Sequence, residues 1–490
     1  MLPERLYTAQ QSRDLDAAAI QGHGVPGYTL MCRAGEACMA AIDEYWPSLT
    51  SISVYCGSGN NGGDGYVIAR LAAGQGMEVE TLALSNPERL RGDAARAYQE
   101  FREQGLSATP WSPDTEPRGS LLVDAMLGTG LDRAVEGSYA GAVAQINALP
   151  VPRLAVDIPS GLSADRGTVL GCAVRADATV TFIGLKQGLF TGSALDHLGR
   201  LRFSGLGVPQ AIYSEIESSG VLLDSRTLNR FLTPRRQDVH KGRFGSVLVV
   251  GGDHGMPGAV RLAGEAALRS GSGLVRVATR SEHAVMLPMT CPELMAAAVE
   301  DAGAVGRQLG WASVVALGPG LGQTPWSREV FGAAVNCERP LVLDADGLNL
   351  LAGGGVQRSN WVLTPHPGEA AGLLGLSTSD IQADRFSAAR EISRRFNAVC
   401  VLKGAGTVVT APDGRMAVCA LGNPGMATAG MGDVLTGVIA AMLAQGLELF
   451  DAACTGVTAH ALAGDLAAAD GQRGLAAGDA IGRLREAVNP

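Results

Sequence analysis

Apolar residues in this 490-residue chain gather in two series of short runs, separated by stretches with helical spacing. In the first half the runs lie at 51–56, 78–84, 121–125, 153–156 and 178–182. Helix-like stretches at 65–73 and 92–104 fall between runs, and those at 8–28 and 31–45 precede the first run. Strand-length runs that alternate with helices predict βαβ units, and therefore a parallel sheet with helices on both faces.

A second series of the same kind follows a polar stretch. Its runs lie at 246–250, 274–278, 313–317, 341–343, 361–363 and 399–402, and long Ala-rich helical patterns begin at Gly432. The segment 212–230 between the two series is polar and has no strong strand pattern, so we expect a domain boundary near residue 220. The prediction is an α/β protein of two three-layer αβα domains, 1–218 and 225–490.

Composition and charge narrow the possible functions. The chain is 46% hydrophobic and 18% charged, as in globular proteins, and its net charge of −9 argues against a nucleic-acid-binding surface. Its nine cysteines are scattered and never spaced as C-x-x-C, which favours buried thiols in a reducing compartment over disulfides or zinc. Neither a signal sequence nor a membrane-length apolar run is present, so we expect a cytoplasmic protein without membrane contact.

A Gly-rich loop follows the first run. Its spacing Gly57-x-Gly59-x-x-Gly62, after a strand and before a helix, satisfies the dinucleotide-binding fingerprint and favours a Rossmann-like domain. The acidic residue that such a site needs after its second strand is not in place, because Glu80 lies before or inside that strand. Asn60, Asn61 and Asp64 add oxygen ligands that a simple pyrophosphate loop does not have.

Two further loops at strand ends carry aspartates. Asp124 precedes a glycine loop at 128–133, and Asp157 begins the segment Asp157-Ile-Pro-Ser160-Gly161. Loops at the carboxyl ends of parallel strands converge on one crevice, where Asn61, Asp124 and Ser160 could bind a cation beside Asp157. Any single aspartate of this kind could simply cap a turn, but three such loops together favour a site.

In the second half, Gly430-Met-Gly-Asp433 leads directly into an apolar helical run. A Gly-rich turn that opens a helix directs unpaired N–H groups and the helix dipole at one point, which attracts an anion. An aspartate in the same turn supplies the base that phosphoryl transfer to a hydroxyl requires. The alternative is an ordinary capped helix start, because Gly and Asp are both common there.

Two other residues of the second half are candidates for ligand contact. His366 stands between two prolines and has little conformational freedom, which suits ligand contact. Lys403, beside Gly404 and Gly406, is either a phosphate contact or an exposed loop lysine. Neither a Walker A string nor a protein-kinase signature is present, so the nucleotide site has another design.

Three segments of the first half resemble the YjeF N-terminal family, the NAD(P)H-hydrate epimerases, over nearly all of residues 1–215. They are Asn60-Asn-Gly-Gly-Asp-Gly65, Asp157-Ile-Pro-Ser-Gly161 and Lys186-Gln-Gly-Leu-Phe-Thr191. The resemblance implies interconversion of the R and S forms of hydrated NADH or NADPH, with Asp157 as acid–base. It implies potassium held by Asn61, Asp124 and Ser160. It implies substrate contacts from Asn60, Asn61, Gly62, Gly63, Asp64, Gly128, Thr129, Gly130, Leu131, Asp132, Arg133 and Asp157.

The second half resembles the ribokinase-like fold, in its NAD(P)H-hydrate dehydratase branch, over about 225–488. The resemblance rests on Thr364-Pro-His-Pro-Gly-Glu369, Lys403-Gly-x-Gly-Thr407 and Gly422-Asn-x-Gly-Met-Ala427 leading to Gly430-Met-Gly-Asp433. Pro424 and Ala429 depart from the family pattern without removing a functional group. The resemblance implies that ADP, with Mg²⁺, phosphorylates the 6-hydroxyl of the S hydrate, AMP is released, and loss of phosphate restores the nicotinamide. It implies Asp433 as base; hydrate contacts from Ala259, Gly320, Gly322, His366 and Asp433; and nucleotide contacts from Lys403, Gly404, Ala405, Gly406, Thr407 and Gly432.

The resulting hypothesis is a bifunctional repair enzyme, a lyase and an isomerase, whose first domain supplies the epimer that the second consumes. One alternative is an ATP-dependent vitamin or sugar kinase that keeps its phosphorylated product. Another makes the N-terminal half a non-catalytic ligand-sensing or oligomerisation module. Because both families tend to form oligomers, we also expect a homo-oligomer.

Overall fold

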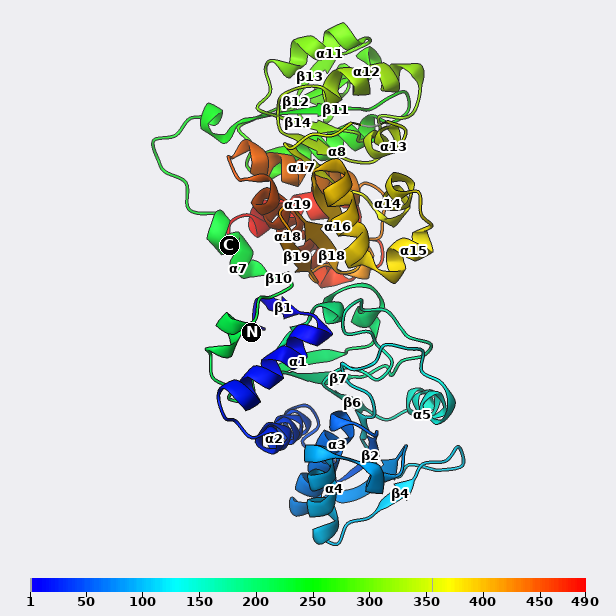
Figure 1. The fold of residues 1–490 in the computed structure, drawn as a ribbon. Coiled ribbons are helices and arrows are strands. Elements are labelled where there is room, and N and C mark those ends of the chain that lie inside the picture. Colours follow the sequence, from blue (N-terminus) through cyan, green and yellow to red (C-terminus); the bar gives the residue numbers. More distant parts are fainter. Residues whose placement is uncertain (1, 355) are drawn as a thin grey trace. The chain divides into compact units, whose positions relative to one another are not determined.

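The computed structural model describes residues 2–354 and 356–490. The chain divides into two compact units, Met1–Val221 and Leu222–Pro490, and Figure 1 shows the elements of each. The α/β class expected from the apolar pattern is confirmed in both units.

The N-terminal unit is built on a parallel sheet in the order β4-β3-β2-β5-β6-β7-β9. The strands are β2 (Ser51–Cys56), β3 (Glu78–Ala83), β4 (Ala108–Pro110), β5 (Leu122–Ala125), β6 (Arg153–Val156), β7 (Ala178–Phe182) and β9 (Arg200–Ser204). The five predicted strands are confirmed, within one residue at their ends. The short edge strands β4 and β9 were not predicted, because their exposed sequences have no apolar run.

Alternate residues of these strands face two separate cores. Val54 and Cys56 of β2 belong to a core with α2 (Gly27–Tyr45), α3 (Asn60–Gly74) and α4 (Gly92–Glu103). Tyr55, between them, belongs to a core with α5 (Gly137–Ala148). Since strand neighbours point to opposite faces, the unit has three layers, helix, sheet and helix.

Two sequence predictions are wrong near this sheet. Residues 8–28 are not one helix: α1 (Ala9–Ala17) passes into a π-helical turn, η1 (Ala18–Gly22), and α2 starts only after Pro26. Proline favours the start of a helix and disfavours its interior, which explains the break. The loop at 60–65 is also helical, because α3 begins at Asn60 and the glycines occupy its first turns.

Three short strands complete the unit. The strand β1 (Arg5–Tyr7) is parallel to β8 (Leu185–Lys186) and antiparallel to the start of β10 (Gly220–Leu223), where the chain passes into the second unit. A short helix, α6 (Ile212–Glu215), precedes β10.

The C-terminal unit has a mixed sheet in the order β13-β12-β11-β14-β15-β16-β17-β18-β19. Its strands are β11 (Ser246–Val250), β12 (Leu274–Thr279), β13 (Met295–Ala298), β14 (Val314–Leu317), β15 (Leu341–Leu343), β16 (Trp361–Leu363), β17 (Val399–Leu402), β18 (Thr407–Thr410) and β19 (Met416–Cys419). Pairing is parallel as far as β17, while β18 and β19 add antiparallel strands. The six predicted strands are confirmed; β13, β18 and β19 were missed.

The C-terminal unit also contains helices, some of which contact the sheet. The helices are α7 (Ser225–Phe231), α8 (Pro257–Arg269), α9 (Ser281–Ala284), α10 (Leu287–Thr290), α11 (Ala302–Leu309), α12 (Pro325–Val335), α13 (Asp346–Ala352), α14 (Pro367–Leu374), α15 (Thr378–Ala383), α16 (Arg385–Phe396), α17 (Met431–Ala444), α18 (Leu449–Ala467) and α19 (Ala477–Ala487). The strand β14 contacts α17 and α12, and β17 contacts α18 and α16. Within the described residues, no helix is both long and apolar enough to span a bilayer.

The helix α17 has an unusual setting. It starts after Gly430, whose φ of 88° is left-handed, and its residues from Val434 to Leu443 are all buried. At Gly437 it meets α8 so closely that a Cβ would lie 2.0 Å from the carbonyl oxygen of Ala263. Because the rest of α17 is packed tightly, the position of its first turn is well defined.

Candidate active sites

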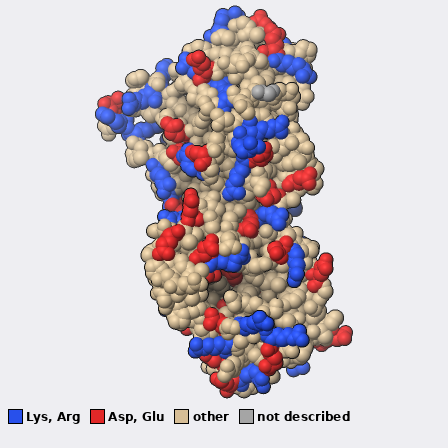
Figure 2. Space-filling model, viewed as in Figure 1, with Lys and Arg blue, Asp and Glu red and all other residues tan. Residues whose placement is uncertain are grey.

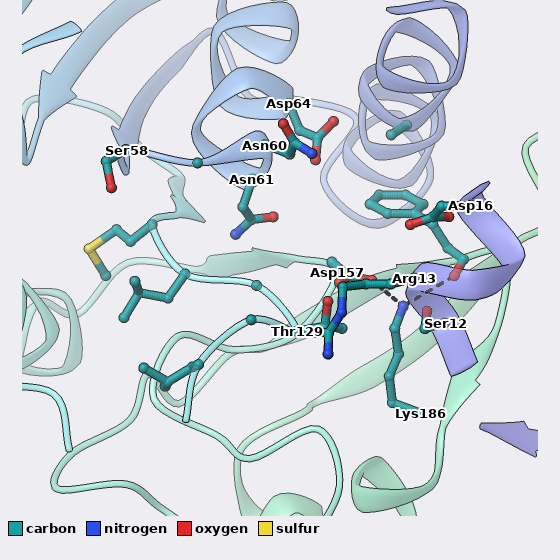
Figure 3. A pocket seen from close by; sticks show the side chains of 18 of the residues that line it. Ser12, Arg13, Asp16, Ser58, Asn60, Asn61, Asp64, Thr129, Asp157 and Lys186 are labelled. Atoms are coloured by element: carbon teal, nitrogen blue, oxygen red, sulfur yellow. Dashed lines mark hydrogen bonds and ion pairs between the residues drawn. The ribbon is translucent and has the colours of Figure 1, made fainter. Parts of the chain in front are cut away.

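The carboxyl ends of the N-terminal strands surround a cavity of about 840 Å³. Its walls come from α1, the start of α3, the loop after β5 and the end of β6. Figure 2 shows acidic side chains at a hollow in this unit, on a face where charges of both signs are otherwise interspersed. Figure 3 shows the polar residues inside the cavity.

Asp157 lies at the centre of this cavity in a strained conformation. Its φ of 67° is left-handed, which is uncommon for a residue other than glycine and concentrates at functional sites. Its Oδ1 accepts a hydrogen bond from Thr181 Oγ1 at 3.3 Å and an ion pair from Lys186 Nζ. Its Oδ2 faces Gly128, 3.8 Å from where a Cβ on that glycine would lie. One oxygen is thus held in place and the other is left toward the cavity.

Lys186 fixes this arrangement. Its side chain is 2% exposed, and its ammonium also donates to Thr181 Oγ1 and to the Phe182 carbonyl, both at 3.1 Å. The three protons of the ammonium therefore have three acceptors. Lys186 stands in the segment 186–191 of the sequence, but its role was not predicted.

Of the three predicted cation ligands, Asn61 lines the cavity, whereas Asp124 and Ser160 are fully buried and do not line it. Ser160 donates to Asp124 through its hydroxyl (2.6 Å) and its backbone N–H (2.8 Å), and its Oγ accepts from Leu127 N at 2.8 Å. Burial raises the pKa of Asp124 to about 6, although the hydrogen bonds from Ser160 and Met126 oppose that shift. Asn61 is 7% exposed, and neither polar atom of its side chain has a partner. A buried carboxamide without partners is costly, so it marks a place for a ligand.

Two further carboxyl groups line the cavity. Burial, followed by the charges of Asp157 and Asp16, raises the pKa of Asp64 well above its usual value. Burial also raises the pKa of Asp16 to about 6, against the opposing effect of Lys186. Asp16 was not predicted, because an acidic residue in an amphipathic helix gives no signal by itself.

The other predicted epimerase residues divide into two groups. Asn60 and the segment Gly128, Thr129, Gly130, Leu131, Asp132 and Arg133 line the cavity. Gly62 and Gly63 do not: a Cβ on Gly62 would lie 2.2 Å from Gly57 O, and one on Gly63 would lie 2.7 Å from Met31 Cε. These two glycines allow close packing at the start of α3.

In the C-terminal unit, Asp433 lies in the first turn of α17, half-buried. Burial, then the charge of Asp344, raises the pKa of Asp433 to about 7, while Lys403 opposes the shift. A carboxyl group that titrates near neutrality suits a general base. Gly432 beside it is close to both charged partners, since its Cβ would lie 3.3 Å from Lys403 Nζ and 3.4 Å from Asp344 Oδ2.

A buried charge network lies under this turn. Lys403 Nζ is 2.6 Å from Asp344 Oδ1 and 3.7 Å from Glu369 Oε2, and Thr436 Oγ1 donates to Asp344 Oδ2 at 2.8 Å. Burial alone would raise the pKa of Asp344, but Lys403 and these hydrogen bonds hold it below its usual value. Lys403 is therefore not an exposed loop lysine: its ammonium points to the base of the helix that carries Asp433.

The segment 403–407 is held by hydrogen bonds from the buried side chain of Arg385, which is 1% exposed. Arg385 donates to the carbonyl oxygens of Leu402, Lys403 and Gly406 at 3.1–3.3 Å. Gly404 (φ 134°) and Gly406 (φ 67°) have left-handed backbones, and Thr407 Oγ1 donates to Gly404 O at 3.1 Å. Sequence reasoning missed Arg385, whose role appears only when α16 is placed against β17.

The structure links the predicted hydrate contacts to Asp433 only in part. A Cβ on Gly320 would lie 3.0 Å from Ala259 Cβ, and Gly322 N donates to Asp346 Oδ2 at 2.8 Å. Asp346 in turn contributes to the raised pKa of Asp433. His366 caps α14, with Nδ1 accepting from Gly368 N at 2.9 Å, and its ring stays largely exposed.

Comparison with known proteins gives the family. Residues 247–485 match the family model described as NAD(P)H-hydrate dehydratase, and residues 27–188 match that of the YjeF-related protein N-terminus. A bifunctional NAD(P)H-hydrate repair enzyme of Coxiella burnetii is 44% identical, over 99% of this chain and 99% of its own. The enzyme of the same description from Escherichia coli K12 is also 44% identical, over 100% and 95%. This chain belongs to the bifunctional NAD(P)H-hydrate repair enzymes.

Solved structures agree with this placement of the repair enzyme's second unit. A ribokinase-like superfamily protein of Enterococcus faecalis is 27% identical, with a TM-score of 0.51, and covers 55% of this chain and 94% of its own. A hypothetical protein of Streptococcus mutans is 28% identical, with the same TM-score, over 55% and 100%. The predicted ribokinase-like fold is thereby confirmed.

Proposed function

We propose that this chain restores hydrated NADH and NADPH in two steps, one in each unit. The N-terminal unit interconverts the R and S hydrates, and the C-terminal unit dehydrates the S hydrate with ADP, giving AMP and phosphate. Family membership over the whole length supports this pairing over a vitamin or sugar kinase with a non-catalytic first half.

In the dehydratase step, Asp433 takes the proton of the 6-hydroxyl, whose oxygen attacks the β-phosphoryl group of ADP. The N–H groups of Met431, Gly432 and Asp433 open α17 and lie where developing phosphate charge is stabilised by the helix dipole. Departure of phosphate from C6, with loss of a proton from C5 to solvent, then restores the C5=C6 double bond of the reduced nicotinamide. The observation that carries this proposal is the position of Asp433 in that turn, with a pKa near neutrality.

The metal expected in the N-terminal unit is potassium. Its proposed ligands, Asn61, Asp124 and Ser160, supply amide, carboxylate and hydroxyl oxygens, which suit a hard cation. The unpartnered Asn61 carboxamide supports this assignment. In the part of the chain that the structure describes, no group of three or more His, Cys, Asp or Glu side chains could hold a metal ion. Bound potassium would fix Asn61 and the loop after β5 beside the substrate.

Magnesium is expected with the adenine nucleotide in the C-terminal unit. Asp344 and Glu369 pair with Lys403, and Asp433 acts on the same ammonium electrostatically. We therefore expect phosphate oxygens of the nucleotide to supply most of the magnesium ligands, with at most one or two carboxylates. We expect Lys403 to face the phosphates and Gly404–Thr407 to hold the adenylate. Cytoplasmic location and a homo-oligomeric state remain part of the same proposal.

Incubation of the full chain with hydrated NADH tests this function. Parallel reactions with ADP, with ATP and without nucleotide would be followed by recovery of absorbance in the reduced-nicotinamide band. We expect recovery with a nucleotide and stoichiometric release of AMP with ADP. A stable phosphorylated product without recovered absorbance would instead identify a kinase.

A further inference from the structure

Asp16 faces the N-terminal cavity from an element that contributes none of the predicted site residues. It lies one residue before the end of α1, and the π-helical turn η1 follows immediately. Such π-helical turns inside or after α-helices are frequent at functional sites. Figure 3 shows Asp16 and Asp157 directed toward the same part of the cavity, near Lys186.

The helix α1, which bears Asp16, is held at its start by hydrogen bonds and near Asp16 by packing. Thr8 and Gln11 form a capping box at the start of the helix, and Ala9 N donates to Asp165 Oδ1 at 2.6 Å. Leu15 and Ala19, on either side of Asp16, are fully buried in the core. The packing therefore gives the Asp16 carboxyl a defined position over the cavity.

Inversion at the hydrated carbon by loss and return of water requires chemistry on both faces of the ring. The hydroxyl departs from one face of the ring, and a new hydroxyl must form on the other face. With only one carboxyl group, the same side chain would have to protonate the leaving hydroxyl and deprotonate the entering water on opposite faces. Asp157 comes from the end of β6, whereas Asp16 comes from α1. The cavity thus offers Asp16 and Asp157 from separate elements, in addition to Asp64 of α3.

Resting on the epimerase function proposed above, we propose that Asp16 is a second catalytic acid–base residue that works opposite Asp157. In one direction the Asp16 carboxyl gives its proton to the 6-hydroxyl. The C6–O bond breaks, water leaves with the bonding electron pair, and the N1 lone pair forms an N1=C6 double bond.

The second half of the step restores the ring on its other face. The Asp157 carboxylate takes a proton from a second water, whose oxygen bonds to C6 while the N1=C6 pair returns to N1. One water leaves and one enters, Asp157 ends protonated and Asp16 ionised, and exchange with solvent resets both. In the reverse direction the two residues exchange roles.

The charges around Asp16 fit this role. Lys186 stabilises its ionised form, while Asp157 destabilises it. Asp64 and Tyr213 are the other titratable groups influenced by Asp16. Burial raises the pKa of Asp16 to about 6, so it can both hold and release a proton near neutral pH.

The test uses the full chain without ADP, so that the dehydratase unit is idle, and follows R-to-S conversion by chromatography. Asp16→Asn should lower the initial rate by about 10²-fold or more, the usual contribution of positioned proton transfer. Asp16→Glu should restore part of the rate. The matched control is Asp14→Asn on the same helix, since Asp14 is tied to Gln10 at 2.8 Å and does not line the cavity; it should react at the wild-type rate.

Two further readouts separate catalysis from folding. In H₂¹⁸O, each inversion by the wild-type chain should place solvent oxygen at C6, and inversion that keeps the original oxygen would overturn the proposal even if Asp16→Asn does not fold. In the wild-type chain, the R-to-S rate should fall as pH rises through the pKa of Asp16, because the Asp16 carboxyl then loses the proton that the reaction needs. This alkaline limb of the pH–rate profile should be absent in Asp16→Asn. A wild-type rate in folded Asp16→Asn would also overturn it. Failure of the epimerase function itself is distinct, because the wild-type chain would then not invert the hydrate.

Discussion

Single side chains set the protonation states on which both proposed reactions depend. Asp433 is buried beside Asp344, which keeps it protonated up to neutral pH, and Lys403 limits that effect. Asp157 is held by hydrogen bonds instead, because Lys186 and Thr181 both donate to its Oδ1. Similar carboxyl groups thus acquire different chemistry from their immediate neighbours.

Asp433→Asn tests the proposed base directly. The amide keeps the size of the side chain but cannot accept the hydroxyl proton, so dehydratase turnover should fall by about 10²–10⁴-fold. Binding of ADP, measured by calorimetry, should persist because the amides of α17 are unchanged. AMP release at the wild-type rate in a single turnover would refute the assignment.

The same substitution should stabilise the protein. The pKa of Asp433 in the folded chain, about 7, lies above its ordinary value of 3.8. The folded state therefore binds this proton more tightly, and stability from this group declines as pH rises from about 4 to about 7. At pH 8 we expect Asp433→Asn to raise the thermal midpoint of the C-terminal unit, whereas at pH 4 the difference should be small.

Lys403→Met should change the pH dependence of the dehydratase. Removal of the ammonium takes away the charge that lowers the pKa of Asp433, so the ionised base is lost at higher pH. The acid limb of the kcat profile should move upward. The exposed Lys241 provides the control, because Lys241→Met should leave the limb in place. A limb that also stays in place in Lys403→Met would contradict the interpretation.

At the scale of elements, the apolar pattern predicted the central parallel strands, because strands buried on both faces read as continuous Val, Ile and Leu runs. It missed β18 and β19, which are antiparallel, and the short strands β4 and β13. It located Asp157 and Asp433 because they end strands or open helices. It missed Arg385 and Asp16, whose roles depend on which helix lies against which loop.

The start of α3 gives a matched pair of glycines, Gly59 just before the helix and Gly62 in its first turn. A Cβ on Gly62 would lie 2.2 Å from Gly57 O, whereas nothing lies within 4 Å of a Cβ on Gly59. Gly62→Ala should therefore destabilise the N-terminal unit by about 1–3 kcal/mol, the usual cost of overpacking. Gly59→Ala should leave the denaturation midpoint unchanged. Equal midpoints for the two variants would show that the turn relaxes freely.

At the scale of the whole molecule, a substitution in the site of one unit should abolish the reaction of that unit and leave the reaction of the other unit unchanged. With a mixture of R and S hydrates and excess ADP, the wild-type chain should recover all the nicotinamide absorbance. Asp157→Asn should recover the S fraction at the wild-type rate and the remainder only at the uncatalysed rate of epimerisation. A single fast phase in this variant would contradict the assignment of Asp157.

The enclosure of α17 limits which substitutions this helix can accept. The amides that would receive phosphate belong to a helix with no free side, and Gly437 leaves no space against α8. A cavity or bulge introduced anywhere along that helix would displace the phosphate position as well as loosen the interior. Selection for heat resistance and selection for turnover therefore act on the same residues, and this segment has little freedom to drift.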